Sequence, residues 1–395
     1  MFRRISICRG ATTAVVAFLL LSTAVHAQSS TVFVEGLKAP QKIIYAPKQD
    51  FFLVTEAGIP TLPNSGRVSV ITNDGDRFTL IDGLPSGNAP PDDAPSGPSG
   101  LWIEGRQLYI AIGTGNATLP GPVPSSEIPN PSPNSPLLSS VLKYTFAWKG
   151  FQPEHSDTNI LYPEDHTRLA RGRSVRIGKY GHSRGTLQML ANFPNYTPAP
   201  RPGFPDLVRN SNPFGIVLHA NTLYVADAAQ NSIRKLTSGG GMRGDLIVYP
   251  PRPNPSAPFG PPVVDPVPDS LRLFGNTLLV TFLTGFPFNA GVADVHQFDL
   301  DSGVDSVVID GLTTAIDVLP VAKDLFSNTV YTLEISSNLL AGAPGRLQRF
   351  DGAGQPPTVI SDTLISPTSI ARDPATGDLL VTEIFPGRIS RIELP

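Results

Sequence analysis

Short runs of β-branched and aromatic residues recur along the chain at a nearly constant spacing. Six runs share the pattern of Leu-Tyr-Val-Ala-Asp, and their third residues lie at positions 54, 110, 225, 280, 332 and 381. The steps between them are therefore 56, 115, 55, 52 and 49 residues, and one step is doubled. Runs of this composition are typical of strands, and a period near 50 residues is typical of stacked repeats. The pattern therefore predicts a β-solenoid or a β-propeller.

Each run has three companions that complete a four-stranded unit. A short segment precedes it and usually begins with proline, which strands tolerate at their first residue. A strand with alternating apolar and polar positions follows, and then a fourth strand. Six units of four strands predict an all-β, six-bladed β-propeller. The preceding segments are Pro40–Ile43, Pro98–Leu101, Pro213–Ile216, Pro268–Leu271, Ala315–Val318 and Pro367–Ile370.

The two ends of the chain predict how the ring closes. The last unit stops after its third strand, at Arg391 and Ile392, and the isolated segment 31–37 has the pattern of a fourth strand. We expect this N-terminal strand to complete the last blade and so to remove the exposed sheet edges. The doubled step contains no complete additional unit. We therefore expect Pro-rich insertions over 113–139 and 146–212 rather than a seventh blade.

The first 27 residues predict export. Arg3 and Arg4 precede a short apolar run, and small residues lie before Gln28, as in a secretory signal peptide. We expect cleavage there, a single propeller domain over residues 28–395, and a secreted or periplasmic protein. No run reaches the ~18–20 apolar residues of a membrane-spanning helix. The only cysteine, Cys8, lies in the signal, which excludes thiol and disulfide chemistry from the mature chain.

Composition and charge narrow the classes of function. Charged residues make up 16% of the chain and the formal net charge is −3. These values exclude a coiled coil, a charge-driven disordered chain and a basic nucleic-acid-binding protein. The 42 prolines and 36 glycines indicate a folded chain with many turns. We expect a monomer that binds no nucleic acid.

The order of the strands predicts where the site lies. If the first strand of each unit is innermost, the connections after the second and fourth strands share one face. These connections are the long ones, such as 57–65, 113–139, 193–212 and 249–267. We call this side the long-loop face. Function usually resides in elaborated loops on a rigid scaffold, so we expect a small molecule or a protein partner here, at the mouth of the central channel.

Six residues are the candidate ligand contacts at this mouth. Lys42, Asp269 and Asp317 lie at the start of innermost strands. Glu56, Glu334 and Glu383 lie at the ends of second strands and would form an acidic rim around the lysine. The alternative is structural, because an acid at a strand end also accepts hydrogen bonds from the backbone of a nearby turn.

The sequence lacks the common motifs of enzymes. It has no nucleophile elbow, no zinc-binding His-Glu-x-x-His helix and no phosphate-binding loop. Residues 154–157 (Glu-His-Ser-Asp) and 164–166 (Glu-Asp-His) offer metal-ligand side chains, but in what we predict to be an irregular, solvated loop. The basic run over 168–184 is either a solvated loop or a binding site for an anionic surface or polymer.

Two segments carry a family resemblance. Residues 211–216 (Ser-Asn-Pro-Phe-Gly-Ile) and 281–288 (Thr-Phe-Leu-Thr-Gly-Phe-Pro-Phe) resemble the ScyD/ScyE family of exported bacterial propellers, which is loosely related to NHL-repeat proteins. The resemblance covers most of residues 31–395 and implies a periplasmic or secreted six-bladed propeller. The namesakes of the family accompany synthesis of the sunscreen pigment scytonemin. Residues 146–200 depart from the family's pattern.

Three classes of function remain open. A binding or scaffolding module needs only the long-loop face, and it leads because no catalytic motif is present. A hydrolase similar to the gluconolactonase propellers would hold calcium with Glu56, Asp269, Asp317 and Glu383, although Pro-Gln-Lys stands at 40–42 where that family has Glu-Gly-Pro. A quinoprotein dehydrogenase similar to the sorbosone-type enzymes would hold its acidic cofactor with Lys42 and arginines, and needs an axial histidine that the sequence does not place.

Overall fold

The computed structural model describes residues 30–90, 94–147, 159–178, 184–321, 329–352 and 355–394. These residues form mostly β-strands, and the strands pair in antiparallel sheets. The predicted signal segment, residues 1–27, lies outside the described residues. No helix in the described part of the chain has the length and hydropathy needed to cross a membrane.

In the described residues, six antiparallel sheets form the blades of a propeller. Blade one consists of β2 (Pro40–Ala46), β3 (Phe51–Glu56), β4 (Gly66–Ile71) and β5 (Arg77–Leu84). Blade two consists of β8 (Pro98–Glu104), β9 (Gln107–Ile112), β12 (Ser140–Phe146) and β14 (Gly185–Asn192), with β13 (Val175–Ile177) added at its edge. Blade three consists of β17 (Pro213–His219), β18 (Thr222–Asp227), β19 (Ser232–Thr237) and β20 (Met242–Val248).

The remaining three blades repeat the same order of strands. Blade four consists of β23 (Pro268–Phe274), β24 (Thr277–Phe282), β25 (Ala293–Asp299) and β26 (Asp305–Leu312). Blade five consists of β27 (Ala315–Pro320), β28 (Val330–Glu334), β29 (Gly345–Phe350) and β30 (Thr358–Leu364). Blade six consists of β31 (Pro367–Arg372), β32 (Leu379–Glu383), β33 (Arg388–Ile392) and the N-terminal strand β1 (Ser30–Val34).

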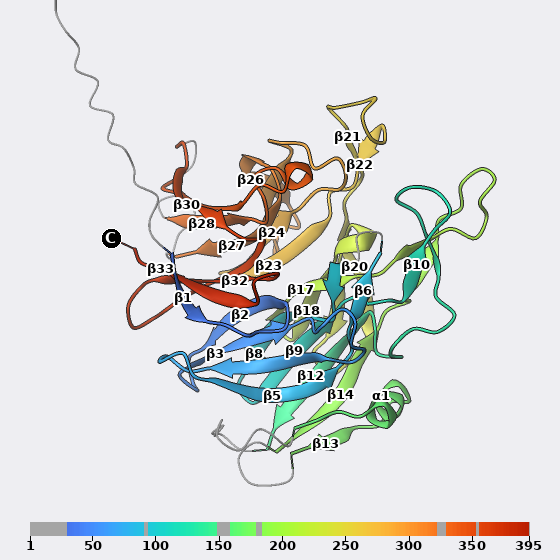
Figure 1. Cartoon of the computed structure of the whole chain (residues 1–395), viewed down its shortest axis with the longest axis vertical. Helices are drawn as coiled ribbons and strands as arrows, with labels where there is room; N and C mark the ends of the chain where they lie inside the picture. The colour runs from blue at the N-terminus through green and yellow to red at the C-terminus, as the bar shows by residue number, and fades with distance from the viewer. Residues whose placement is uncertain are drawn as a thin grey trace, which may run out of the picture.

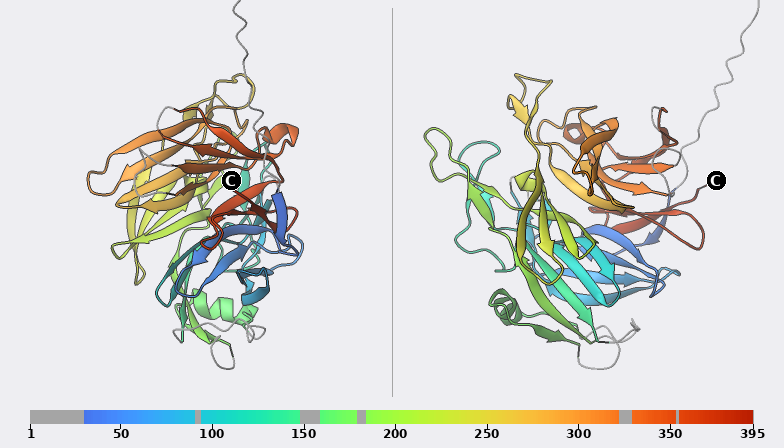
Figure 2. Two further views of the ribbon diagram at one scale, coloured as in Figure 1. Left: turned by 90° about the vertical axis from the view of Figure 1, so that its left-hand side faces the viewer. Right: turned by 180° about the vertical axis from the view of Figure 1, so that it is seen from behind.

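The N-terminal strand closes the ring. β1 pairs antiparallel with β33, with Ser30 opposite Ile392 and Thr31 opposite Arg391, and Figure 1 shows the blue strand beside the red one. The innermost strands contact one another in the order β2, β8, β17, β23, β27, β31 and back to β2. Figure 2 shows the red C-terminal sheet next to the blue N-terminal sheet in two further views. The predicted six-bladed propeller and its closure are confirmed.

Each innermost strand carries an irregularity just after its first residue. In blade one Pro40 pairs with Glu56 and Lys42 with Thr55, and the same register shift recurs in the other five blades. Such a bulge bends the strand and re-aims its side chains. A Cβ added at Gly100 would lie 2.1 Å from the carbonyl oxygen of Phe214. The innermost strands therefore approach one another too closely here for a side chain at that position.

The hydrophobic core lies between neighbouring blades. In one cluster, Leu53 and Val68 of blade one are fully buried together with Leu108 and Ile110 of blade two. These are alternate residues of their strands, as the two-residue period of a strand requires. The interblade clusters hold the innermost strands in place, and so they position every side chain at the channel.

The segment between the second and third repeats, where the spacing is 115 residues, contains local structure that the sequence pattern did not predict. Helix α1 (Pro163–Ala170) spans the motif at 164–166, which we expected in an irregular loop, and buries His166 and Leu169. Residues 113–139 contribute β10 (Thr118–Pro120) and β11 (Glu127–Pro129), which join β16 (Val208–Asn210) and β15 (Tyr196–Pro198) in a small sheet. The irregular loop predicted for 164–166 was wrong, and the short strands were not foreseen, because three-residue strands and an eight-residue helix are too short for a period to show.

The connections after second and fourth strands share one face, as the strand order requires. They carry the small sheet, the pair β6 (Gly87–Ala89) and β7 (Ala94–Ser96), and the pair β21 (Arg252–Pro253) and β22 (Val263–Val264). Two short 3-10 helices, η3 (Ala228–Gln230) and η4 (Leu339–Ala341), lie in the same connections. Figure 1 shows β10 and the β21–β22 loop projecting from the body of the ring.

Candidate functional site

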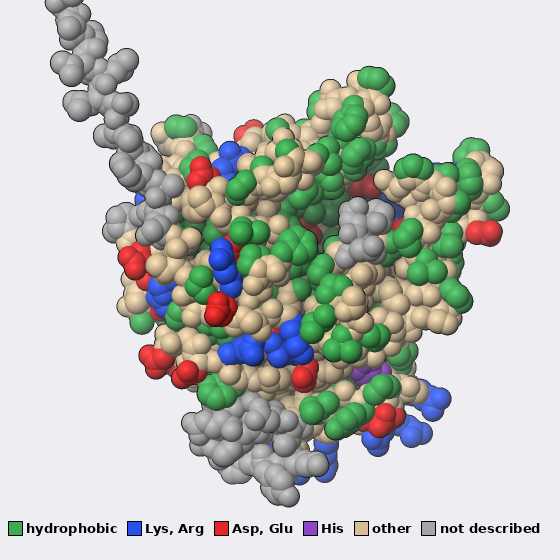
Figure 3. Space-filling view, in the orientation of Figure 1, with side chains coloured by type: hydrophobic (Ala, Val, Ile, Leu, Met, Phe, Trp, Pro, Cys, Tyr) green, Lys and Arg blue, Asp and Glu red, His purple; other side chains and the backbone are tan. Residues whose placement is uncertain are grey.

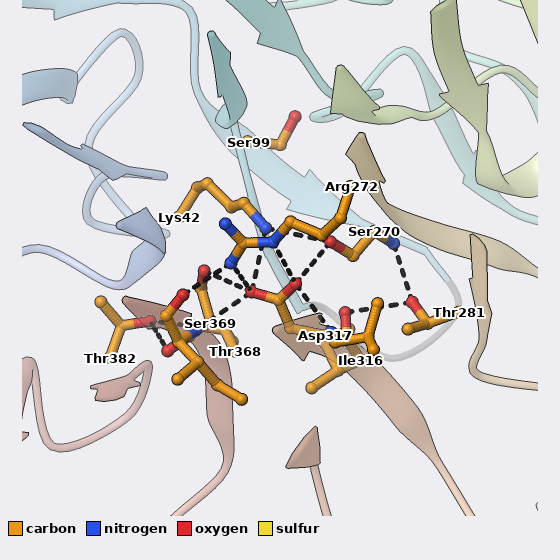
Figure 4. A network of polar contacts seen from close by, with 12 residues as sticks. Lys42, Ser99, Ser270, Arg272, Thr281, Ile316, Asp317, Thr368, Ser369 and Thr382 are labelled. Atoms are coloured by element: carbon orange, nitrogen blue, oxygen red, sulfur yellow. Dashed lines mark hydrogen bonds and ion pairs between the residues drawn. The ribbon is translucent and has the colours of Figure 1, made fainter. Parts of the chain in front are cut away.

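A buried network around Asp317 crosses the central channel (Figure 4). Asp317 lies on β27 and accepts hydrogen bonds from Lys42 Nζ at 2.9 Å and from Arg272 Nε and Nη2 at 3.0 and 2.6 Å. The other donors to this carboxylate are Ser270 Oγ, Ser369 Oγ and the backbone amides of Val318 and Ile370. Side chains from blades one, four, five and six therefore meet at one carboxylate.

The charges in this network do not balance. Burial by itself would raise the pKa of Asp317, but Arg272 and Lys42 hold that pKa well below its usual range. Burial and then the charge of Arg272 lower the pKa of Lys42 to about 8, against the opposing effect of Asp317. Two cations share this one carboxylate, so neither cation has a full counter-charge. The network therefore carries a net positive charge at neutral pH.

Of the three charged residues in this network, the sequence analysis predicted two as candidates and missed one. Lys42 and Asp317 start their innermost strands, and the structure brings them together in the channel as that placement predicts. Arg272 was not among the candidate residues. It lies two residues after Ser270 on β23, and residues two apart on a strand share one face. Following the period of two along each innermost strand would have found it.

The three predicted rim glutamates have partners within their own blades. Glu383 accepts the backbone amide of Ile365 at 2.5 Å and pairs with Arg388 at 2.7 Å. Glu56 pairs with Arg67 and Glu334 with Arg346 in the same way, and these three carboxylates have no solvent exposure. Each also accepts an amide from the turn before the innermost strand of its blade. The geometry therefore favours the structural alternative for these residues, and their contact with a ligand stays a prediction.

Asp269 is a buried carboxyl without a partner for one of its oxygens. It is 4% exposed on β23, and its Oδ2 has no hydrogen-bond partner among the described residues. Burial raises the pKa of Asp269 well above its usual range, which favours a neutral acid. At the equivalent positions, Ser99 and Thr368 donate to the carbonyl oxygens of Pro213 and Pro40 in the next blade. A protonated carboxyl has the same capacity to donate.

A large part of the long-loop face is apolar, and charged residues such as Arg201, Asp206 and Asp265 lie in its longer connections. The connections 57–65, 228–231, 283–292, 335–344 and 384–387 contain no charged residue. The large apolar side chains exposed in connections on this face are Ile59, Leu62, Leu119, Tyr196, Phe204, Phe259, Val263, Phe286, Leu340, Ile365 and Phe385. Phe259 and Phe286 are in contact, with ring centroids 5.5 Å apart. Figure 3 shows hydrophobic atoms over the β21–β22 loop and around the hollow beside it.

No metal centre is built from the described residues. They contain no group of three or more His, Cys, Asp or Glu side chains placed to hold a metal ion. Glu56 and Glu383, two of the four ligands of the calcium alternative, are each paired with an arginine instead. The geometry of the described part therefore gives that alternative no ligand cluster.

The histidines of the described residues lie away from the channel. His166 on α1 is buried and bridges Ser135 Oγ and the carbonyl oxygen of Gly83, at 2.9 and 2.8 Å. His296 on β25 contacts Asp294 and Asp305, and His219 ends β17. None of the three lines the channel beside Lys42. The motif at 154–157, which includes His155, lies outside the described residues.

The basic run is partly described. Arg168, Arg171, Arg173, Arg176 and Arg184 are all exposed. Arg168 lies 3.5 Å from Asp165 in the same helix. Exposed arginines next to a short helix fit a solvated surface as well as they fit an anion site, so the structure leaves both interpretations of this run open.

Comparisons with known proteins yield similarities of fold alone. No protein-family model and no curated protein matches the chain. A putative oxidoreductase (glucose dehydrogenase) from Thermus thermophilus is 13% identical, with 92% of this chain and 99% of that chain covered and a TM-score of 0.49. A gluconolactonase from Xanthomonas campestris is 11% identical, with 92% and 89% covered and a TM-score of 0.48. Similarity at this level identifies no activity, and the propeller is established by its strand pairing.

Proposed function

We propose that this chain is an exported, non-catalytic binding protein of the ScyD/ScyE type that holds an uncharged, apolar partner on its long-loop face. The observation that carries the proposal is the gathering of exposed apolar side chains on the loops of one face, where five connections contain no charged residue. Exposed apolar surface is costly for a soluble protein unless something covers it. The five connections without charge also offer no Lys or Arg to anionic lipids or nucleic acids, which are bound through these residues.

The position of this surface supports binding rather than catalysis. It is carried by loops on a closed ring, and rigid scaffolds with elaborated loops are typical of recognition sites. The carboxylates nearest to it are held by arginines or buried. A general acid or base must reach its substrate, and Glu56, Glu334 and Glu383 are paired with arginines of their own blades.

Nile red, an uncharged apolar dye, provides the test. We expect the wild-type protein to bind it saturably, and we expect the double variant Phe259→Ser/Phe385→Ser to bind it at least about tenfold more weakly, because two large apolar contacts are lost. These side chains are 57% and 69% exposed. Their removal therefore leaves the core intact.

Val304→Ser is the matched control for this experiment. Val304 is 58% exposed and lies in the turn between β25 and β26, on the opposite face. Dye binding by this variant should equal that of the wild type. A wild-type protein that binds no dye, or a loss that is equal in the control and the double variant, would contradict the proposal.

A further inference from the structure

A cavity lies inside the ring, on the other side of the Asp317 network from the long-loop face. Its volume is about 410 Å³, within the usual range for small-molecule sites. The lining begins at Lys42 and Arg272 and ends at Pro47 and Arg372, which adjoin the hairpins between first and second strands. All lining residues belong to the described part of the chain, and six blades contribute to it.

The inner end of this cavity is positively charged and has free hydrogen-bond donors. An ammonium group has three protons, and Lys42 Nζ uses two of them, toward Ser270 Oγ and Asp317 Oδ2. Arg272 donates through Nε and Nη2, whereas its Nη1 makes no hydrogen bond to a described residue. Asp317 is the counter-charge for both cations. An anion placed here would meet free donors and an uncompensated positive charge.

The wall of the cavity is apolar. Ile44, Trp102, Ile216 and Leu319 face one another from four different blades around the channel. Apart from the indole Nε1 of Trp102, which is buried and has no hydrogen-bond partner among the described residues, these four side chains carry no polar atom. Such a wall favours contact with a hydrocarbon or an aromatic ring. The charged groups of the lining therefore lie at the two ends of the cavity, Lys42 and Arg272 at the inner end and Arg372 at the outer end.

We propose that this cavity binds an amphipathic organic anion, with its carboxylate on Lys42 and Arg272 and its apolar body against Trp102 and Leu319. The proposal is independent of the proposed function, because it concerns the opposite side of the network and a ligand of different charge. A desolvated carboxylate on two cations gains charge-assisted hydrogen bonds, while its chain is removed from water. Both gains require a ligand that combines the two properties.

Decanoate and decan-1-ol are matched probes of this site, because they differ only in the head group. Trp102 lies in the cavity wall and is one of two tryptophans. In a Trp148→Phe background its fluorescence is the sole tryptophan signal. We expect saturable titration by decanoate and at least about tenfold weaker binding of decan-1-ol. Lys42→Met should weaken decanoate binding at least about tenfold, as the loss of a charged hydrogen-bond donor predicts.

Two further variants keep the experiment decisive. Lys235→Met removes a lysine from β19, away from the cavity, and should leave decanoate binding unchanged. Leu319→Trp fills the cavity and removes no group of the Asp317 network, and it should abolish binding even if Lys42→Met fails to fold. Equal binding of the acid and the alcohol, or normal decanoate binding by Leu319→Trp, would overturn the proposal. Nile red binding by Lys42→Met is measured as well, because it tests the long-loop face separately. Failure of the cavity proposal can then be distinguished from failure of the proposed function.

Discussion

Buried carboxylates at the ends of second strands act as clamps within their blades. Glu56, Asp227, Glu334 and Glu383 each accept a backbone amide from the turn before the innermost strand and a guanidinium from the third strand. The residue type therefore recurs because four of the six blades make the same connection, whereas Ile112 and Phe282 end the second strands of blades two and four. A repeated acid in a repeat protein is consequently weak support for a ligand site.

Glu383→Gln should lower the free energy of unfolding by about 2–4 kcal/mol, because it breaks a buried ion pair and leaves Arg388 without its counter-charge. The measurement is urea unfolding at neutral pH. Glu35→Gln is the control, because Glu35 is exposed, and it should change stability by less than about 0.5 kcal/mol. A loss of the same size in both variants would contradict the clamp.

Individual residues also show why the candidate site was predicted only in part. Lys42 and Asp317 occupy equivalent positions in two repeats, so the period alone brought them to one channel. The period cannot show which acids form ion pairs within their own blade, because the partners Arg67 and Arg388 lie on a different strand from Glu56 and Glu383. Nor does it reveal exposure, which decides the apolar character of the long-loop face.

Among the elements, the connection between blades three and four is tied to blade four by an ionic cluster. Arg252 on β21 forms a bidentate pair with Asp294 on β25, at 2.9 and 3.0 Å. His296 contacts Asp294 as well, and lies 2.8 Å from Asp305 on β26. The cluster thus fixes the β21–β22 loop, which carries Phe259 of the long-loop face.

The stabilisation from His296 should depend on pH. Burial lowers the pKa of His296, but hydrogen bonds to Asp294 and Asp305 and their charges outweigh it and raise that pKa from 6.5 to about 9. Because the folded pKa is the higher one, the stabilisation is fully present below about pH 6.5 and is lost as pH rises through about 9. We expect His296→Gln to cost about 1–2 kcal/mol at pH 6 and much less at pH 9.5, measured by urea unfolding. A cost that does not change with pH would contradict this assignment.

Elements were predictable where the pattern repeats and unpredictable where it does not. Six copies of one strand pattern reinforce one another, so the blades and the role of β1 followed from the sequence. Helix α1 has eight residues, of which two are buried. The strands β10, β11, β15 and β16 have three residues each. Elements of this size are stabilised by tertiary contacts more than by their own sequence.

At the scale of the whole molecule, the two faces of the ring differ in charge. The turns opposite the long-loop face contain acids such as Asp50, Asp301, Asp351 and Asp373, whereas five connections of the long-loop face contain none. This asymmetry follows from the order of the strands, which puts all connections after second and fourth strands on the same side, and closure of the ring arranges the six blades around one channel. The pairing of β1 with β33 therefore underlies the placement of both proposed sites.

A disulfide between these two strands tests that pairing most directly. Thr31 and Arg391 are opposite each other, and in a chain that begins at Gln28 the variant Thr31→Cys/Arg391→Cys has no other cysteine, because the sequence contains only Cys8. We predict that the disulfide forms on oxidation and stabilises the oxidised over the reduced protein by about 3–5 kcal/mol in urea unfolding. A pair that stays reduced under oxidising conditions, or whose oxidation destabilises the protein, would contradict a ring closed by the N-terminal strand.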